Sequence, residues 1–585
     1  MKDNQKRNLS DKVIMTRLLK YAMPFKKNFI ISFALILVAV ILDVLIPIFM
    51  GKTITLLTGD DIDYTNIIIL CIVFLVSILL VVFTEYKQTM LLQKTGQGIM
   101  FNIREEVFGH IEKLSIAQIN EIPTGKLVTR VTNDTNTLNE MYTSVLINLV
   151  KNILSLVGIT IAMLIVNIKL ALLVLAVCPF VAILSIIFRK YSRRAYREVR
   201  ENLSNVNAFL SENLSGMKIT QIFNQENKKY NEFDERNTAL KKSSIKEILI
   251  FGIFRPTMYG LYVVATILVL YFGSKLALDK VIEVGVLVTF TTYISRFFNP
   301  IQQLAEQFNV LQSAFASSER IFEVLDTVPN VVDTDGAIEL DEVKGKIEFR
   351  NVWFKYTEDE WILKDVSFVV NPKESCAFVG ATGAGKTTIL GLLVRNYDIQ
   401  KGDIFLDDIN IKDIKISSLR KNIGQMLQDV FLFSGDIYSN ITLGEEVTFE
   451  EVKEACDYVN ATTFINKLED GFDSKVRERG NNFSSGQRQL LSFARTIVHK
   501  PNIMILDEAT ANIDTETEVL IQESLSKMMN IGTMLIVAHR LSTIQHCDNI
   551  IVLHHGRIIE SGTHQELLKK HGYYFNLYKL QFANK

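Results

Sequence analysis

Six long apolar runs before residue 310 restrict the fold of this chain more than any other feature. Each run approaches or exceeds the roughly 20 apolar residues that an α-helix needs to cross a bilayer. They lie at 29–50, 67–83, 145–166, 170–188, 252–272 and 284–305. We therefore predict six membrane-spanning helices within residues 29–325, after a polar segment at 1–28.

The distribution of Lys and Arg predicts the orientation of these helices. One side holds 27 Lys and Arg residues, in the segments 1–28, 87–144 and 189–250. The other side holds four, in the connections 51–66, 167–169 and 273–283. Because cytoplasmic loops retain positive charge, we expect both chain termini in the cytoplasm. The two long internal segments keep a helical period and are expected to extend the spans beyond the bilayer.

The composition changes after Asp326. A linker is predicted at 326–345, and from 346 to 585 short β-branched runs alternate with helical patterns, as at 376–379, 503–506 and 533–537. This alternation predicts an α/β domain with a largely parallel sheet. The 63 Lys and Arg of the chain balance its 64 Asp and Glu, so no basic excess points to nucleic acid.

A phosphate-binding loop is predicted at 380–387, where the sequence reads G-A-T-G-A-G-K-T between an apolar strand and a helical segment that begins near Thr388. Its glycines let backbone N–H groups surround phosphates, and they are Gly380, Gly383 and Gly385. Lys386 is expected to reach the β- and γ-phosphates, and the Thr387 hydroxyl to bind Mg²⁺. A chance match is disfavoured because strand, loop and helix all agree.

Two carboxylates follow the apolar run at 503–506. Asp507 is suited to binding Mg²⁺, and Glu508 to acting as the base that positions an attacking water. The alternative is that both carboxylates merely lie in solvent at the end of a strand. Beside a phosphate-binding loop, the pair predicts hydrolysis of Mg²⁺-bound ATP.

The segment 483–489 reads F-S-S-G-Q-R-Q, which resembles the signature of ATP-binding cassette (ABC) proteins. With six spans before it, the chain resembles an ABC exporter half-transporter. This resemblance implies an all-α membrane domain of the type IV exporter fold, fused to an α/β nucleotide-binding domain of the P-loop class. It also implies an adenine-stacking aromatic, a Q-loop glutamine near Mg²⁺, a switch histidine and a D-loop aspartate, at Tyr356, Gln428, His539 and Asp514.

In this family the signature caps the γ-phosphate bound by the opposite subunit, so the resemblance implies a dimer. The signature residues here are Ser484, Ser485, Gly486 and Gln487. Family members commonly have Leu and Gly where this chain has Phe483 and Ser485. Since the phosphate loop, Glu508 and His539 are intact, the chain resembles the subunit of heterodimeric bacterial multidrug exporters that holds the competent ATP site. A homodimer that tolerates the altered signature remains open.

Two cytoplasmic segments resemble the parts of exporters that carry motion to the membrane domain. The segment 124–134 resembles the pattern that follows the first coupling helix, and 212–223 resembles the second coupling helix. Ordinary amphipathic helices are the alternative reading of both.

Ionisable residues inside membrane spans are costly and become functional candidates. Asp43 lies deep in the first span, where it could attract a cationic substrate or pair with Arg255 or Arg296. The sixth span mixes polar and aromatic residues, which predicts that it lines a cavity with residues such as Tyr293 and Phe297. Packing between spans is an equal alternative for each of these residues.

We therefore expect ATP-driven export of hydrophobic or cationic amphiphilic compounds by alternating access, with ATP and Mg²⁺ as cofactors. The expected partners are a second half-transporter, membrane lipids and a small amphiphilic substrate, and the expected location is a bacterial plasma membrane. A lipid or peptide exporter is the nearest alternative. An ATP-gated sensor or channel is a different class, which the hydrolytic pair Glu508 and His539 disfavours.

Overall fold

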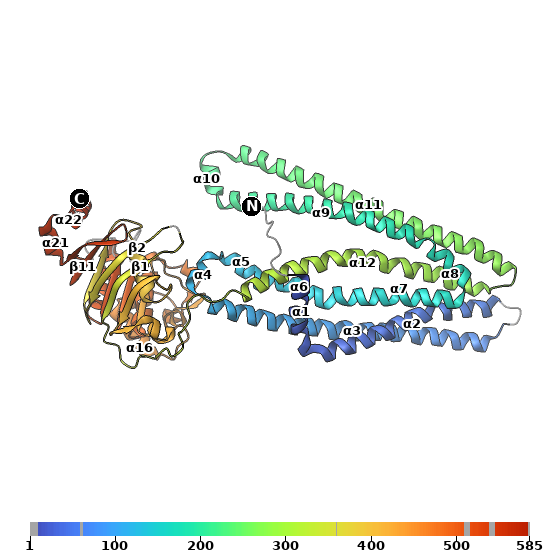
Figure 1. Ribbon diagram of the computed structural model, residues 1–585, viewed down its shortest axis with the longest axis horizontal. Helices are drawn as coiled ribbons and strands as arrows, with labels where there is room; N and C mark the ends of the chain where they lie inside the picture. The colour runs from blue at the N-terminus through green and yellow to red at the C-terminus, as the bar shows by residue number, and fades with distance from the viewer. Residues whose placement is uncertain (1–9, 59–61, 359, 508–514, 538–543, 583–585) are drawn as a thin grey trace. The chain divides into compact units, whose positions relative to one another are not determined.

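The computed structural model describes residues 10–58, 62–358, 360–507, 515–537 and 544–582 (Figure 1). It divides into two compact units. The first unit comprises Met1–Glu112 and Thr124–Thr327, and the second comprises Lys113–Pro123 and Val328–Lys585.

The first unit is helical. Its long helices are α1 (Asp11–Ala22), α2 (Lys26–Thr58), α3 (Tyr64–Lys113), α7 (Leu146–Val166), α9 (Cys178–Ser215), α11 (Glu226–Leu278) and α12 (Val284–Leu325). Shorter helical segments connect them: η1 (Met23–Phe25), α5 (Thr124–Thr129), α6 (Thr135–Glu140), α8 (Ile168–Leu175) and α10 (Met217–Ile222). Two π-helical turns, η2 (Arg130–Asp134) and η3 (Met141–Val145), interrupt the helix that leads into α7.

By length and composition, five helical stretches among the described residues could cross a membrane. They are Asp11–Thr58, Tyr64–Lys113, Thr124–Val166, Ile168–Ser215 and Glu226–Leu278. The sixth predicted span lies in α12, whose apolar character is diluted by threonines, Arg296 and Asn299. The long helices also confirm that the spans continue well past the length that a bilayer requires.

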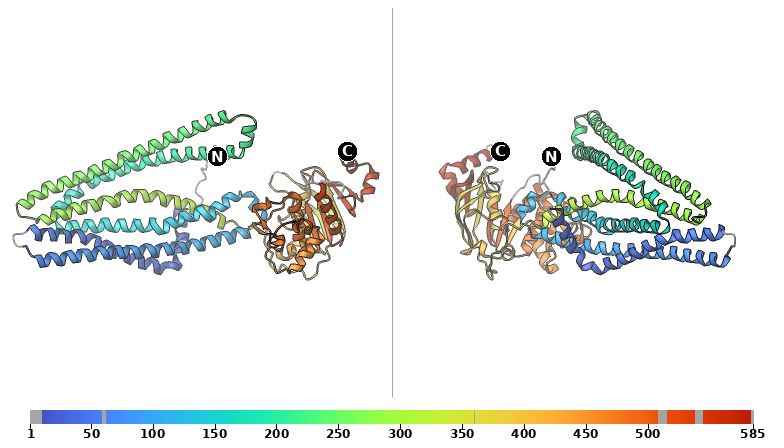
Figure 2. Two further views of the ribbon diagram at one scale, coloured as in Figure 1. Left: turned by 180° about the vertical axis from the view of Figure 1, so that it is seen from behind. Right: turned by 45° about the vertical axis from the view of Figure 1, so that its right-hand side comes forward.

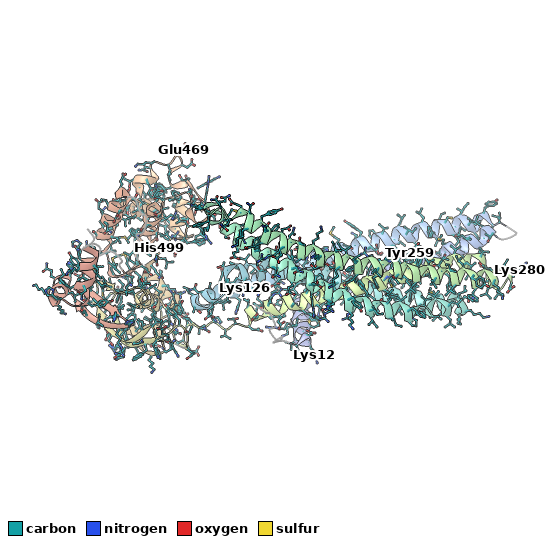
Figure 3. The ribbon with its side chains drawn as sticks, turned by 90° about the horizontal axis from the view of Figure 1, so that it is seen from above. Lys12, Lys126, Tyr259, Lys280, Glu469 and His499 are labelled. Atoms are coloured by element: carbon teal, nitrogen blue, oxygen red, sulfur yellow. The ribbon has the colours of Figure 1, made fainter. Side chains whose placement is uncertain are left out.

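Helices α9 and α11 run side by side and diverge from α12 toward their connection through α10 (Figure 2). Within the rest of this unit α12 packs against both α2 and α7. Figure 3 places Lys280, in the short α11–α12 connection, and Lys126, on α5, toward opposite ends of the helical unit. These two ends correspond to the sides that the charge distribution separates.

The second unit contains the predicted parallel sheet. Its strand order is β12-β11-β3-β10-β9-β6, with every neighbouring pair parallel except β11 and β12. The strands are β3 (Ser375–Val379), β6 (Ile423–Met426), β9 (Ile503–Asp507), β10 (Thr533–Val537), β11 (Asn549–His554) and β12 (Arg557–Gly562). The three predicted strands are β3, β9 and β10, and each is buried along its whole length, as expected for strands covered on both faces.

An antiparallel sheet of order β2-β1-β4-β5 lies beside this core. Its strands are β1 (Ile347–Phe354), β2 (Leu363–Val370), β4 (Lys401–Leu406) and β5 (Ile409–Asn410), and β7 (Gly435–Asp436) pairs with β8 (Lys475–Val476). The helices include α4 (Ile116–Glu121), α13 (Lys386–Leu393), α16 (Phe449–Tyr458), α18 (Ser485–Val498), α19 (Thr515–Met528) and α21 (His564–Lys570). The prediction of an all-α membrane domain fused to an α/β domain is confirmed.

Candidate functional site

The register of the parallel sheet brings the predicted nucleotide motifs to one edge. Val537, the last residue of β10, pairs with Phe378 of β3 on one side and with Asp507 of β9 on the other. On the far side of β9, Met426 of β6 pairs with Leu506. The carboxyl ends of these strands therefore lie next to one another, which is where open α/β sheets bind ligands.

The phosphate-binding loop joins β3 to α13 at this edge. Gly383 and Gly385 adopt positive φ angles of 82° and 99°, a backbone region that favours glycine. The Lys386 ammonium is folded into the loop, where Nζ donates to the carbonyls of Gly380 at 2.9 Å and Ala381 at 3.1 Å. Burial lowers the pKa of Lys386, and the charge of Asp507 opposes that shift. An anionic phosphate bound in this loop would stabilise the buried ammonium by charge pairing.

Two of the predicted metal ligands lie together. The Thr387 hydroxyl, at the start of α13, donates to Asp507 Oδ1 across 3.4 Å. These oxygens come from adjacent parts of the sheet edge and are the ligand type that Mg²⁺ prefers, so the donor set fits this ion. Gln428, two residues beyond β6, is exposed at the same edge. Glu508, Asp514 and His539 lie outside the described residues.

Tyr356 follows β1 and reaches the beginning of α13. Its hydroxyl lies 3.0 Å from Thr388 Oγ1. The ring packs edge-on against Phe354 and Tyr397, with centroids 4.8 and 5.1 Å apart. Because the side chain remains 49% exposed, it offers an aromatic surface beside the phosphate loop that suits stacking on a base.

The altered signature forms a regular helix start. Ser484 is the N-cap of α18: its hydroxyl accepts from Gln487 N at 3.2 Å, and Gln487 Oε1 accepts from Ser484 N at 3.0 Å. Phe483 is buried in the core against Phe464. Ser485 is the first residue of α18 and is partly exposed, whereas the following residue, Gly486, is buried. The Phe483 and Ser485 differences therefore leave the N–H groups of the helix start in place.

Sequence reasoning missed the role of Arg488 in holding this region. Its guanidinium donates from Nη1 to the carbonyl of Phe483 at 2.6 Å and to that of Gly480 at 3.3 Å. The arginine thus ties the signature to the preceding loop at 477–480. A cation four residues after the helix N-cap was the available signal, although many surface arginines share it.

In the helical unit, side chains of α12 donate hydrogen bonds to backbone carbonyls of α2 near Pro47. Pro47 has no N–H, and its ring excludes the helical hydrogen bond to the Asp43 carbonyl. Arg296 Nη1 donates to that carbonyl at 2.6 Å and to Asp43 Oδ1 at 2.9 Å. One turn earlier in α12, Tyr293 donates to the carbonyl of Val44 at 2.6 Å, and a further turn earlier Thr289 donates to that of Pro47 at 3.1 Å. The polar side chains of α12 therefore satisfy the interrupted backbone of α2.

This network assigns the sequence candidates to different environments. Asp43 pairs with Arg296, which is the structural alternative predicted for this carboxylate. Tyr293 and Phe297 are 0% and 6% exposed in the apolar core, so packing is the reading that the structure supports for both. Arg255 lies exposed on α11.

A polar pocket of about 590 Å³ adjoins the Asp43–Arg296 pair. Sequence reasoning missed the polar residues that α7 contributes to it, which are Asn148, Lys151, Asn152 and Ser155. Their spacing of three to four residues on a single apolar span was the signal that could have identified them.

The segment expected to form the second coupling helix contains the short helix α10. Gly216 ends α9 and begins α10, with φ −92° and ψ 10°. The tip exposes large apolar side chains, each more than 60% accessible, at Leu214, Ile219, Ile222 and Phe223.

Comparison with known proteins agrees with both units. The model of the ABC transporter transmembrane region matches residues 29–301, and the ABC transporter model matches residues 363–511. The uncharacterized ABC transporter ATP-binding protein YknV of Bacillus subtilis is 38% identical over 97% of this chain and 94% of its own length.

Two further relatives carry functional names. The probable multidrug resistance ABC transporter ATP-binding/permease protein YheH of Bacillus subtilis is 38% identical over 86% of this chain and 75% of its own length. The ATP-dependent lipid A-core flippase of Syntrophus aciditrophicus is 33% identical over 85% of this chain and 83% of its own length. The chain therefore belongs to the ABC transporter family, as an exporter half-transporter that joins a multi-pass membrane domain to an ATPase that is coupled to transport.

Proposed function

We propose that this chain is one half of a heterodimeric exporter of amphiphilic compounds, of the multidrug efflux type, in a bacterial plasma membrane. Both termini lie in the cytoplasm in this proposal. The membrane domain spans residues 29–325, a linker spans 326–345 and the cassette spans 346–585. The observation that carries the catalytic part is the contact of Thr387 with Asp507, at the sheet edge where the loop holds Lys386.

We assign the roles at this edge as follows. The loop glycines and Lys386 bind the ATP phosphates, Tyr356 stacks on adenine, and Thr387, Asp507 and Gln428 hold Mg²⁺. When bound, Mg²⁺ neutralises charge on the phosphates during transfer. Glu508 positions the attacking water, while His539 and Asp514 act near the γ-phosphate and at the dimer contact.

The signature supports the heterodimer. Ser484 and the helix start of α18 are formed as a phosphate cap requires, but Ser485 places a side chain where the family commonly has glycine. In this proposal, that side chain would crowd the phosphate cap of the ATP site to which this signature belongs. The site formed by this chain's own phosphate loop needs a signature from another subunit, and we propose that a partner with the common sequence supplies it.

ATPase activity of the purified chain, alone and with candidate second halves, tests the dimer. We expect little ATPase activity from the chain alone and high activity after a partner is added. Glu508→Gln should abolish the activity of the complex. Strong activity from the chain alone, again lost in Glu508→Gln, would establish a homodimer. Replacing Ser485 by Gly in the active heterodimer should raise turnover at the second site.

Directional transport separates a pump from a sensor or channel. In proteoliposomes, ATP should drive accumulation of an amphiphile against its gradient, and Glu508→Gln should abolish that accumulation. A protein that hydrolyses ATP without accumulating any amphiphile would contradict the export proposal. A lipid exporter is the second candidate, because one relative is named as a lipid A-core flippase.

A further inference from the structure

We propose that the polar pocket between α2, α7 and α12 binds the anionic headgroup of the exported amphiphile, with Lys151 and Arg296 as its cationic ligands. This inference rests on the proposed export function and names the substrate class. A phosphate or carboxylate on an apolar tail has the chemistry that the pocket fits. The volume of about 590 Å³ lies within the usual range for small-molecule sites.

The charges that line the pocket favour an anion. One carboxylate, Asp43, and two cations, Lys151 and Arg296, line it. Glu85 of α3 pairs with Lys151 but is not among the lining residues, and its side chain is 42% exposed. Lys151 can therefore exchange this accessible partner for an anionic ligand of the same charge.

The carboxylate in the pocket is already engaged. Asp43 accepts from Arg296 Nη1 through its side chain, and the same nitrogen donates to the Asp43 carbonyl. Pro47 has removed the helical donor for that carbonyl, so releasing Arg296 would leave this partly buried backbone acceptor without its donor. A cationic ligand would have to break this arrangement and then face two cations at low dielectric.

The cations, by contrast, retain donors. A guanidinium has five N–H groups, and among the described residues Arg296 donates only through Nη1. Asn152 is 5% exposed, and its Nδ2 has no partner among the described residues. Buried polar atoms are seldom left without a partner, so this amide donor is explained if a ligand or water accepts from it. Anionic oxygens are acceptors that match these donors.

Amphiphiles with one tail and different headgroups test the proposal in the reconstituted transporter. We would compare dodecyl phosphate with dodecyltrimethylammonium for ATPase stimulation and ATP-driven uptake in phosphatidylcholine vesicles. Dodecyl phosphate should stimulate at a concentration at least tenfold lower. Dioleoyl phosphatidic acid and inorganic phosphate, run in parallel, distinguish a lipid headgroup from a free phosphate. Inorganic phosphate alone should be ineffective because it has no tail.

Two substitutions of opposite expected effect separate ligand binding from folding. Lys151→Gln should raise the half-stimulating concentration of dodecyl phosphate about tenfold, whereas Glu85→Gln, which frees Lys151, should lower it several-fold. Lys169→Gln, at an exposed position outside the pocket, should change neither stimulation nor basal activity. Loss of stimulation in both Lys151→Gln and Glu85→Gln would mean that the ion pair is only structural, which overturns the proposal.

The outcomes distinguish this inference from the function on which it rests. Preferred uptake of dodecyltrimethylammonium would refute the anionic headgroup and leave export intact. Active ATP hydrolysis with no uptake of either compound would instead refute the export function.

Discussion

Replacing Gly285 by Ala tests a close helix crossing in the membrane domain. Helix α12 meets α2 where Gly285 faces Gly51. A Cβ atom on Gly285 would lie 1.9 Å from the carbonyl oxygen of Gly51 and 2.4 Å from Thr55 Oγ1. A backbone oxygen cannot rotate away as a side chain can, so the helices must separate by about 1.5 Å to restore ordinary contact at 3.4 Å.

The energetic cost follows from three terms. Overpacking of this kind costs about 1–3 kcal/mol. Separation also breaks the hydrogen bond from Thr289 to the Pro47 carbonyl, now 3.1 Å long, and interhelical bonds in membranes contribute about 0.6 kcal/mol. Alanine recovers roughly 0.5–1 kcal/mol of helix propensity relative to glycine. The net destabilisation is about 2 kcal/mol, which corresponds to a fall of roughly 3 °C in melting temperature for a unit of this size.

Thermal unfolding of the purified protein in detergent measures this change. Gly260→Ala on α11 is the matched control, because a Cβ there meets nothing within 4 Å. The control should be unchanged or slightly more stable. Equal melting temperatures for the two variants would show that the α2–α12 crossing is not as close as the structure places it.

Four further predictions concern other sites. Lys386→Ala should raise the Kd of a fluorescent ATP analogue at least tenfold, since the ammonium is the buried cation of the phosphate loop; an unchanged Kd would exclude that role. Asp134 is 3% exposed and accepts from Arg130 at 3.0 Å, from Ser317 at 2.8 Å and from Arg320. Asp134→Ala should therefore lower the free energy of unfolding by about 2–3 kcal/mol. A decrease of less than about 0.5 kcal/mol in urea titrations would contradict this. Burial raises the pKa of the Cys456 and Cys547 thiols to about 12, and that of Cys376 well above its usual value, so N-ethylmaleimide at pH 8 should label these residues only after unfolding, as peptide mass spectrometry can show. Gly216→Leu at the α9–α10 junction should preserve ATPase activity and reduce transport in vesicles, whereas intact coupling would argue against a coupling role for α10.

The nucleotide motifs were predictable because each is local in sequence. A phosphate-binding loop needs glycines, a lysine and a threonine within eight residues, and a strand and a helix on either side supply its context. The structure adds the register that brings Asp507 of β9 to Thr387, which is 120 positions earlier in the chain. The strand order β3-β10-β9-β6 brings these two residues together, and that order is a property of the folded sheet.

By itself, the sequence predicted the long apolar helices of the membrane domain, the α/β domain that follows them, and the local motifs of the phosphate site. Hydrophobic length and short motifs carry this information along the chain. Only the tertiary structure decided that Arg296 meets Asp43, that Gly51 meets Gly285, and that Lys151 and Asn152 share a pocket with that ion pair. The physical reason is that lipid is as apolar as the helix surfaces, so hydrophobicity places a helix in the membrane without choosing its neighbour. Close packing and hydrogen bonds between distant residues make that choice.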